Sequence, residues 1–165
     1  MVKKIAIFVV VCGVAKLALA FLPDSMILAS FCRIPAEVAA FYYGVPLEAD
    51  MVLDARLSFT ARGVTLAVTR SCAATDFFAL VASVLLTARI LRKGVDVRCF
   101  RGLFDLVFAW IITLVVNSLR IIALVPVDSI FPKDHAPIVH LLVGVAFFLP
   151  VFAFIWYYAS KEVKR

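Results

Sequence analysis

Three side chains with complementary chemistry stand out in an otherwise strongly apolar chain: Cys72, Arg120 and His140. A thiol becomes a nucleophile when it ionises to the thiolate. A neighbouring imidazole can take that proton and later return it to a leaving amine. A guanidinium can stabilise an oxyanion, or hold a carboxylate through its fork of N–H donors. Together these are the residue types that a cysteine-dependent acyl-transfer site requires.

Two further polar residues lie at helical spacing from this set and are predicted to support it. Asn117 precedes Arg120 by three residues, and Asp76 follows Cys72 by four, so each pair shares a helix face. His135 is the alternative base to His140, but the two are five residues apart and off one helical face, so no metal site is predicted.

The composition decides where such a site must be built. Of the 165 residues, 65% are hydrophobic and only 17% are charged, and the mean hydropathy is +1.08. A soluble domain of this size could not bury so much apolar surface. The predicted fold class is therefore an all-α integral membrane protein, and the net charge of +6 is no evidence for nucleic-acid binding.

Four apolar segments are predicted to form about four transmembrane helices in a single polytopic membrane domain. They lie near residues 5–22, 72–91, 103–125 and 138–160, and residues 23–71 form a long outer segment. The second is short and must tolerate mismatch with the bilayer. The first also has signal-peptide features, Lys3 and Lys4 before an apolar run that ends in Ala18-Leu19-Ala20, but Lys16 interrupts that run.

The distribution of cations predicts the orientation of these spans. Ten lysines and arginines flank one side of the predicted spans and five flank the other. Both termini and the loop at residues 89–101 are therefore predicted to be cytoplasmic. The segment 23–71, the loop 126–137 and the Cys72, Arg120 and His140 ends would face outward from a cytoplasmic (inner) membrane.

The outer segment has two parts with different patterns. Residues 25–43 have apolar residues at helical spacing, broken by Pro35, which suggests a helix lying in the membrane interface. Residues 56–60 and 64–69 alternate in polarity around a turn at Ala61-Arg62-Gly63, which predicts a small extracytoplasmic β-hairpin. This hairpin leads directly into Cys72 and is expected to lie over the site, as a lid or as an edge for the substrate.

These motifs resemble the exosortase/archaeosortase family, and the compact exosortase K type in particular. The resemblance rests on Thr69-Arg70-Ser71-Cys72-Ala73-Ala74 after a hairpin, on Asn117-Ser118-Leu119-Arg120-Ile121, and on His140-Leu141-Leu142-Val143-Gly144. It covers residues 50–145. The chain departs from the family at Ala74, where many members have glycine, and it has four predicted spans rather than seven or eight.

The resemblance implies a membrane cysteine transpeptidase or protease with Cys72 as nucleophile, His140 as acid–base and Arg120 as oxyanion or substrate stabiliser. Asn117 would be a supporting residue. The implied partner is the C-terminal sorting signal of an exported protein, made of a short motif, a transmembrane helix and a basic tail, beside membrane lipids. No cofactor is implied.

The same residues also allow other interpretations. A small oligomeric transporter or channel subunit could use Lys16, Asp76 and Arg120 as an ion path, and a non-catalytic membrane assembly partner would need none of them. Cys32 could form a disulfide with Cys72 in an oxidising compartment. Cys12 and Cys99 are interpreted as packing residues.

Overall fold

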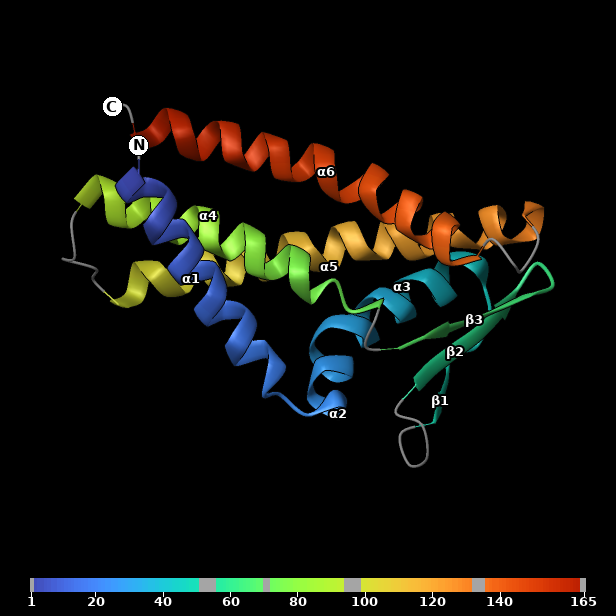
Figure 1. Cartoon of the computed structure of the whole chain (residues 1–165). Helices are drawn as coiled ribbons and strands as arrows, with labels where there is room; N and C mark the ends of the chain where they lie inside the picture. Colours follow the sequence, from blue (N-terminus) through green and yellow to red (C-terminus); the bar gives the residue numbers. More distant parts are fainter. Residues whose placement is uncertain (1, 51–55, 70–71, 94–98, 132–135, 164–165) are drawn as a thin grey trace. The chain divides into compact units, whose positions relative to one another are not determined.

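The computed structural model describes residues 2–50, 56–69, 72–93, 99–131 and 136–163. It is mostly helical, with one small sheet (Figure 1). The chain divides into two compact units. The first unit comprises residues 1–21, 75–113 and 149–165, and the second unit comprises residues 22–74 and 114–148.

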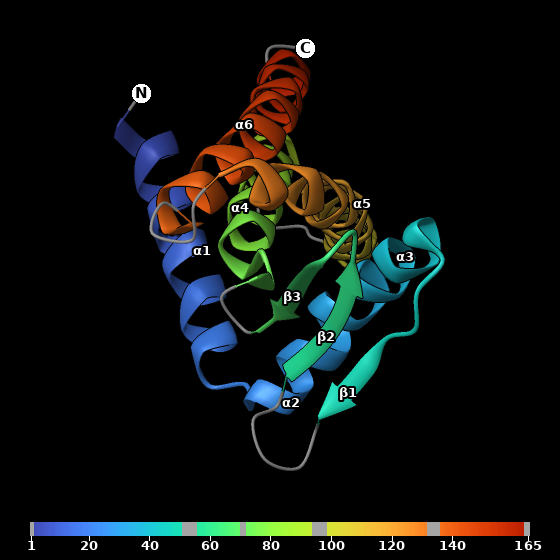
Figure 2. The ribbon, with the colours of Figure 1, turned by 90° about the vertical axis from the view of Figure 1, so that its right-hand side faces the viewer.

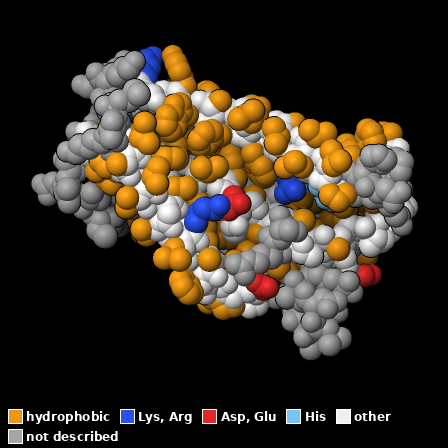
Figure 3. Space-filling view, viewed as in Figure 1, with side chains coloured by type: hydrophobic (Ala, Val, Ile, Leu, Met, Phe, Trp, Pro, Cys, Tyr) orange, Lys and Arg blue, Asp and Glu red, His pale blue; other side chains and the backbone are white. Residues whose placement is uncertain are grey.

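Three helical stretches within the described ranges are long and apolar enough to cross a membrane: Asp24–Tyr43, Gly102–Ile130 and Pro137–Lys161. A shorter apolar helix covers Ile5–Ala20. Large apolar side chains are exposed on all of them, and hydrophobic atoms dominate the surface in Figure 3. Because such a surface is costly in water and suited to lipid, the chain is a helical membrane protein.

The set of long apolar helices differs from the predicted spans in two places. The helix α4 (Thr75–Lys93) is not among them, because Asp76 lies at one end and Arg89, Arg92 and Lys93 lie at the other. The stretch Asp24–Tyr43, expected to be an interfacial helix broken at Pro35, is instead continuous and of spanning length. The predicted outer segment 23–71 thus contains a helix of spanning length and composition.

In the first unit, α1 (Val2–Ala20) packs along α4. Among the described residues, two ion pairs join helices here: Lys16 Nζ lies 3.2 Å from Asp76 Oδ1, and Arg89 makes a two-pronged contact with Asp105 on α5 (Cys99–Ile130). Phe8 and Trp156 meet edge to face, with ring centroids 5.9 Å apart. The charges of Asp76 and Arg89 on α4 are thus neutralised by its neighbours, which lowers the cost of placing them among apolar helices.

The second unit begins with one bent helical segment. It consists of α2 (Asp24–Ile27), a π-helical turn η1 (Leu28–Cys32) and α3 (Arg33–Tyr43). The wider π turn ends three residues before Pro35, whose ring would clash with the carbonyl four residues earlier in a regular α-helix. Gly44 ends α3 in the left-handed conformation, with φ of +66°, and its N–H donates to backbone oxygens of the last turn.

The strands β1 (Glu48–Asp50), β2 (Arg56–Ala61) and β3 (Val64–Val68) form an antiparallel sheet in that order (Figure 2). The predicted hairpin is confirmed, with Ala61 paired to Val64 and positive φ at both Arg62 and Gly63, as a two-residue turn requires. The strand β1 was not predicted. Alternate residues of β2 and β3 are buried, and β2 packs against α3.

The helix α5 (Cys99–Ile130) continues through Pro126, although an outward loop was expected to begin there. Pro126 has no N–H to donate to the carbonyl of Ile122. The hydroxyl of Tyr43 on α3 donates to that oxygen instead, at 2.7 Å. Because the freed carbonyl has a new partner, the helix gains another turn and ends at Ile130, before α6 (Ala136–Val163).

Candidate functional site

Cys72 lies in the short connection between β3 and α4 and is half-buried. Its backbone N–H donates to the carbonyl oxygen of Thr69 at 2.8 Å, which closes a tight turn. Ala74, two residues later, has a φ of +52°. This left-handed conformation favours glycine over a residue with a Cβ.

Asn117 on α5 fixes the backbone of Cys72. Its side chain is fully buried, and Nδ2 donates to the carbonyl oxygen of Cys72 at 2.8 Å. The same Nδ2 lies 3.5 Å from the carbonyl oxygen of Phe31. The amide oxygen Oδ1 is buried without a partner in the described part of the chain. Because buried amides carry a large desolvation cost, this side chain is placed to hold backbone rather than to fill space.

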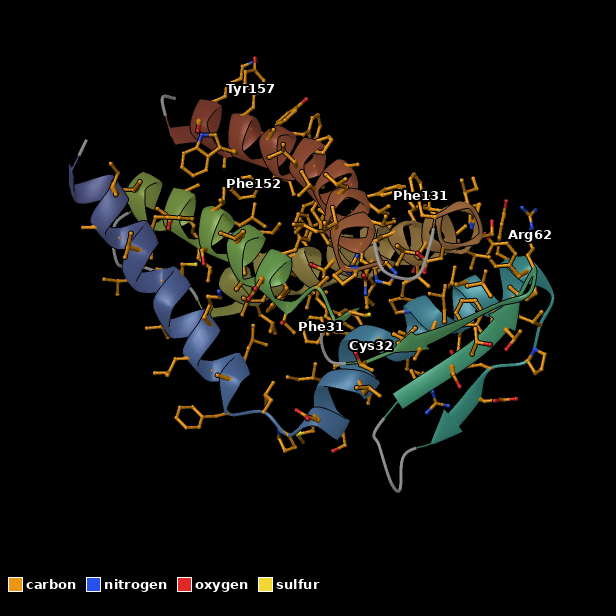
Figure 4. All side chains as sticks on the ribbon, turned by 45° about the vertical axis from the view of Figure 1, so that its right-hand side comes forward. Phe31, Cys32, Arg62, Phe131, Phe152 and Tyr157 are labelled. Atoms are coloured by element: carbon orange, nitrogen blue, oxygen red, sulfur yellow. The ribbon has the colours of Figure 1, made fainter. Side chains whose placement is uncertain are left out.

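The contact with Phe31 is explained by the proline on α3. Pro35 cannot donate to the carbonyl four residues earlier, which belongs to Phe31. Phe31 and Cys32 lie next to each other on the helical segment of the second unit (Figure 4). Asn117 therefore ties Cys72 and the π turn to the same point on α5.

Arg120 lies one turn beyond Asn117 on α5 and contacts α6. Its Cζ lies 5.7 Å from the centre of the Phe148 ring. Gly144 leaves room beside it, because a Cβ built on that glycine would lie 3.5 Å from Arg120 Nε. Nε is buried without a hydrogen-bond partner, and Arg120 has no ion pair to any described carboxylate. The guanidinium is thus a cation among apolar groups with unused donor capacity.

His140 on α6 is one turn before Gly144 and is paired with Asp128 on the last turn of α5. The atom Nε2 lies 2.9 Å from Oδ2 and 3.2 Å from Oδ1 of that carboxylate. The Asp128 side chain is 16% exposed and the His140 side chain 31%. The pair is therefore shielded from water on most sides.

The three predicted residues all belong to the second unit and are linked by these contacts. Asn117 bonds Cys72 and lies one turn from Arg120, and Arg120 contacts the helix face that carries His140. No hydrogen bond joins the thiol to the imidazole within the described ranges. The predicted direct thiol–imidazole contact is therefore not among the contacts of the described residues.

The other predicted participants lie elsewhere. Asp76 belongs to the first unit, where it pairs with Lys16. His135, the alternative base, lies outside the described residues. The hairpin packs on α3, and Arg62 at its turn lies over the Tyr43 ring, with Cζ 5.6 Å from the ring centre.

Cys32 is a neighbour of the site that the sequence singled out only as a disulfide partner. It is completely buried, and its Sγ lies 3.6 Å from the carbonyl oxygen of Thr69, the oxygen that also accepts from the Cys72 N–H. Cys32 and Cys72 are both free thiols in this structure.

Sequence reasoning missed Asp128, which it assigned to an outward loop. A pattern for it exists, because Asp128 follows Asn117 by eleven residues, or about three helical turns, and so shares its face. Using that pattern required the helix to pass Pro126. Among the described residues, no group of three or more histidines, cysteines or acids could hold a metal ion.

Comparison of the chain with protein-family models, with curated proteins and with solved structures found no match. The candidate site therefore rests on its own geometry and chemistry.

Proposed function

We propose that the protein is a membrane cysteine transpeptidase or protease that cleaves C-terminal sorting signals of exported proteins at the outer face of the cytoplasmic membrane. The observation that carries this proposal is the linkage of Cys72, Arg120 and His140 within one unit through Asn117 and Gly144. Such a linkage is unusual for polar groups in a membrane protein unless they act together.

The proposed reaction uses only side chains of this chain. His140 takes the thiol proton of Cys72, and Sγ attacks the scissile carbonyl carbon of the substrate. The negative charge moves to the carbonyl oxygen, where the Arg120 guanidinium stabilises it. The C–N bond then breaks, the imidazole returns the proton to the leaving amine, and a thioester remains on Cys72. An acceptor amine or water attacks that thioester and restores the thiol.

Two features of Arg120 support its role in this scheme. Its Nε has no hydrogen-bond partner and no carboxylate among the described residues pairs with it, so donors are available for a developing oxyanion. Its apolar surroundings at Phe148 and Gly144 lower the local dielectric constant, so a hydrogen bond to an anion is stronger there than in water. An arginine that merely stabilised the fold would be expected to have an acidic partner.

The alternatives receive no specific support. An ion path through Lys16 and Asp76 would need these charges to be available, yet they neutralise each other at 3.2 Å. A non-catalytic assembly partner would not require a half-buried arginine whose Nε is buried without a hydrogen-bond partner in the described part of the chain.

The test is a comparison of exported proteins in the organism that makes this chain, with the wild-type gene or with Cys72→Ala. C-terminal peptides are identified by mass spectrometry. We expect a set of proteins that lose an apolar helix and basic tail in the wild type and retain them in Cys72→Ala. Cys12→Ala is the matched control and should behave as wild type. Identical C-termini in the wild-type and Cys72→Ala cells would overturn the proposal.

A further inference from the structure

The pairing of Asp128 with His140 occurs where helix stability alone would not place either residue. Asp128 lies in the last turn of α5, where the negative end of the helix dipole disfavours an acid. His140 lies in the second turn of α6, where the positive end disfavours an imidazolium. Each residue offsets the other, which points to a role for the pair beyond the stability of its own helices.

The geometry of the pair selects one ring nitrogen. Both carboxylate oxygens of Asp128 lie within hydrogen-bond distance of Nε2, at 2.9 and 3.2 Å. An ionised carboxylate is acceptor-only, so the proton of a neutral imidazole is held at Nε2. Nδ1 then has its lone pair free, and it has no hydrogen-bond partner in the described part of the chain.

We infer that Asp128 is the positioning residue of the site: it holds His140 as the Nε2–H tautomer, so that Nδ1 is the atom that takes the proton from the Cys72 thiol. This inference rests on the proposed function. It also assigns a further task to Asp128, because a carboxylate beside Nε2 stabilises the imidazolium that forms after proton transfer. Among the described residues, Arg120 is a further charged group near this face of α6, one turn away at Gly144.

The continuation of α5 through Pro126 is what makes this arrangement available. Asp128 is two residues beyond that proline, and it is in helical register only because Tyr43 satisfies the Ile122 carbonyl. A loop beginning at Pro126 would have left Asp128 in solvent. The pairing of Asp128 with His140 therefore depends on the extension of α5 past Pro126.

The first experiment reads the tautomer directly. The chain has two histidines, so His135→Gln leaves His140 as the only one. With ¹⁵N-labelled histidine in the full chain in detergent, at a pH where the ring is neutral, we expect Nε2 to be protonated and Nδ1 to be bare. In Asp128→Asn the side-chain amide can donate to Nε2, so the proton should shift to Nδ1, while Asp128→Glu should keep it at Nε2. An unchanged tautomer in Asp128→Asn would overturn the inference.

The second experiment asks whether the tautomer matters for the thiol. Alkylation of Cys72 is timed in membranes for Asp128→Asn, Asp128→Glu and His140→Ala, with Glu37→Gln as a matched removal of another acid. We expect Asp128→Asn to slow alkylation about tenfold or more, as His140→Ala does, and Asp128→Glu to restore most of the rate. A normal rate in Asp128→Asn alone would overturn the inference. A normal rate in His140→Ala as well would overturn the proposed function too.

Discussion

Asn117 Nδ2 and the carbonyl oxygen of Cys72 form a 2.8 Å hydrogen bond that joins α5 to the turn carrying the candidate nucleophile. The donor is fully buried, and the same nitrogen also lies within reach of the Phe31 carbonyl. The Asn117 side chain thus contacts the backbone of both Cys72 and Phe31. Its removal is the simplest way to separate the position of Cys72 from its chemistry.

We predict that Asn117→Leu, which is close in size, lowers the free energy of unfolding by about 1–3 kcal/mol, because the Cys72 carbonyl loses its partner. Cys72 alkylation should also slow, because the turn that presents the thiol is no longer held. Thermal unfolding in detergent measures the first effect. Val115→Leu, an exposed position on the same helix, is the control and should change neither quantity. An unaltered unfolding temperature in Asn117→Leu would contradict the assignment.

Glycine in place of Ala74 should raise the free energy of unfolding. Its φ of +52° costs an L-residue about 1–2 kcal/mol, a cost that glycine does not have. We therefore expect Ala74→Gly to stabilise the protein by about 1 kcal/mol, after allowing for the greater freedom of glycine in the unfolded chain. The neighbouring Ala73→Gly is the matched control and should be destabilising, since Ala73 is completely buried. Equal effects of the two changes would argue against the left-handed turn.

The bond from Tyr43 to Ile122 should depend on Pro126. We predict that Tyr43→Phe costs about 1 kcal/mol in the wild type, because the Ile122 carbonyl is left unpaired. In a Pro126→Ala background the new N–H can donate to that carbonyl, so Tyr43→Phe should cost much less. A double-mutant cycle on the free energy of unfolding measures this coupling. Strictly additive effects would show that the hydroxyl does not compensate for the proline.

Mild oxidation should join Cys32 to Cys72. The Cys32 sulfur and the Cys72 backbone nitrogen contact the same Thr69 oxygen, so the two thiols belong to one small neighbourhood. Diamide would accept the two electrons and two protons that the thiols lose as the disulfide forms. We expect Cys72 to become inert to alkylation in the wild type. In the Cys32→Ser variant, Cys72 should still be alkylated after the same treatment. If Cys72 were protected from alkylation equally in the Cys32→Ser variant, its oxidation partner would have to be another group.

The hairpin and the apolar helices were predictable from the sequence because their causes are local. Polarity alternates along β2 and β3, and the turn was predicted at Ala61-Arg62-Gly63; the structure shortens it to Arg62 and Gly63, because Ala61 pairs with Val64. The strand β1 could not be predicted in this way, since Glu48–Asp50 gains its conformation from pairing with β2. Tertiary hydrogen bonds also decided where α5 ends, because a proline ends a helix only if the freed carbonyl finds no partner.

The site was predictable to the same degree. The residue types and their spacing singled out Cys72, Arg120 and His140, and the structure brings them into one unit with Asn117. Asp128 was missed because its role depends on the helix extension past Pro126. Asp76 was placed beside Cys72 by helical spacing, but Ala74 turns the chain before α4 begins, and Asp76 pairs with Lys16 instead.

The most direct test of the account is the rate at which an activated-thiol reagent labels Cys72 in intact membranes. The labelling rate of Cys72 in the wild type is compared with its rate in Arg120→Ala and His140→Ala. The labelling rate of Cys12 in the same chain serves as the reference. The account predicts fast labelling from the outer face that falls about tenfold or more in His140→Ala, because the imidazole no longer accepts the thiol proton. Slow labelling, equal to that of an ordinary cysteine and indifferent to both substitutions, would contradict a coupled thiol–imidazole site.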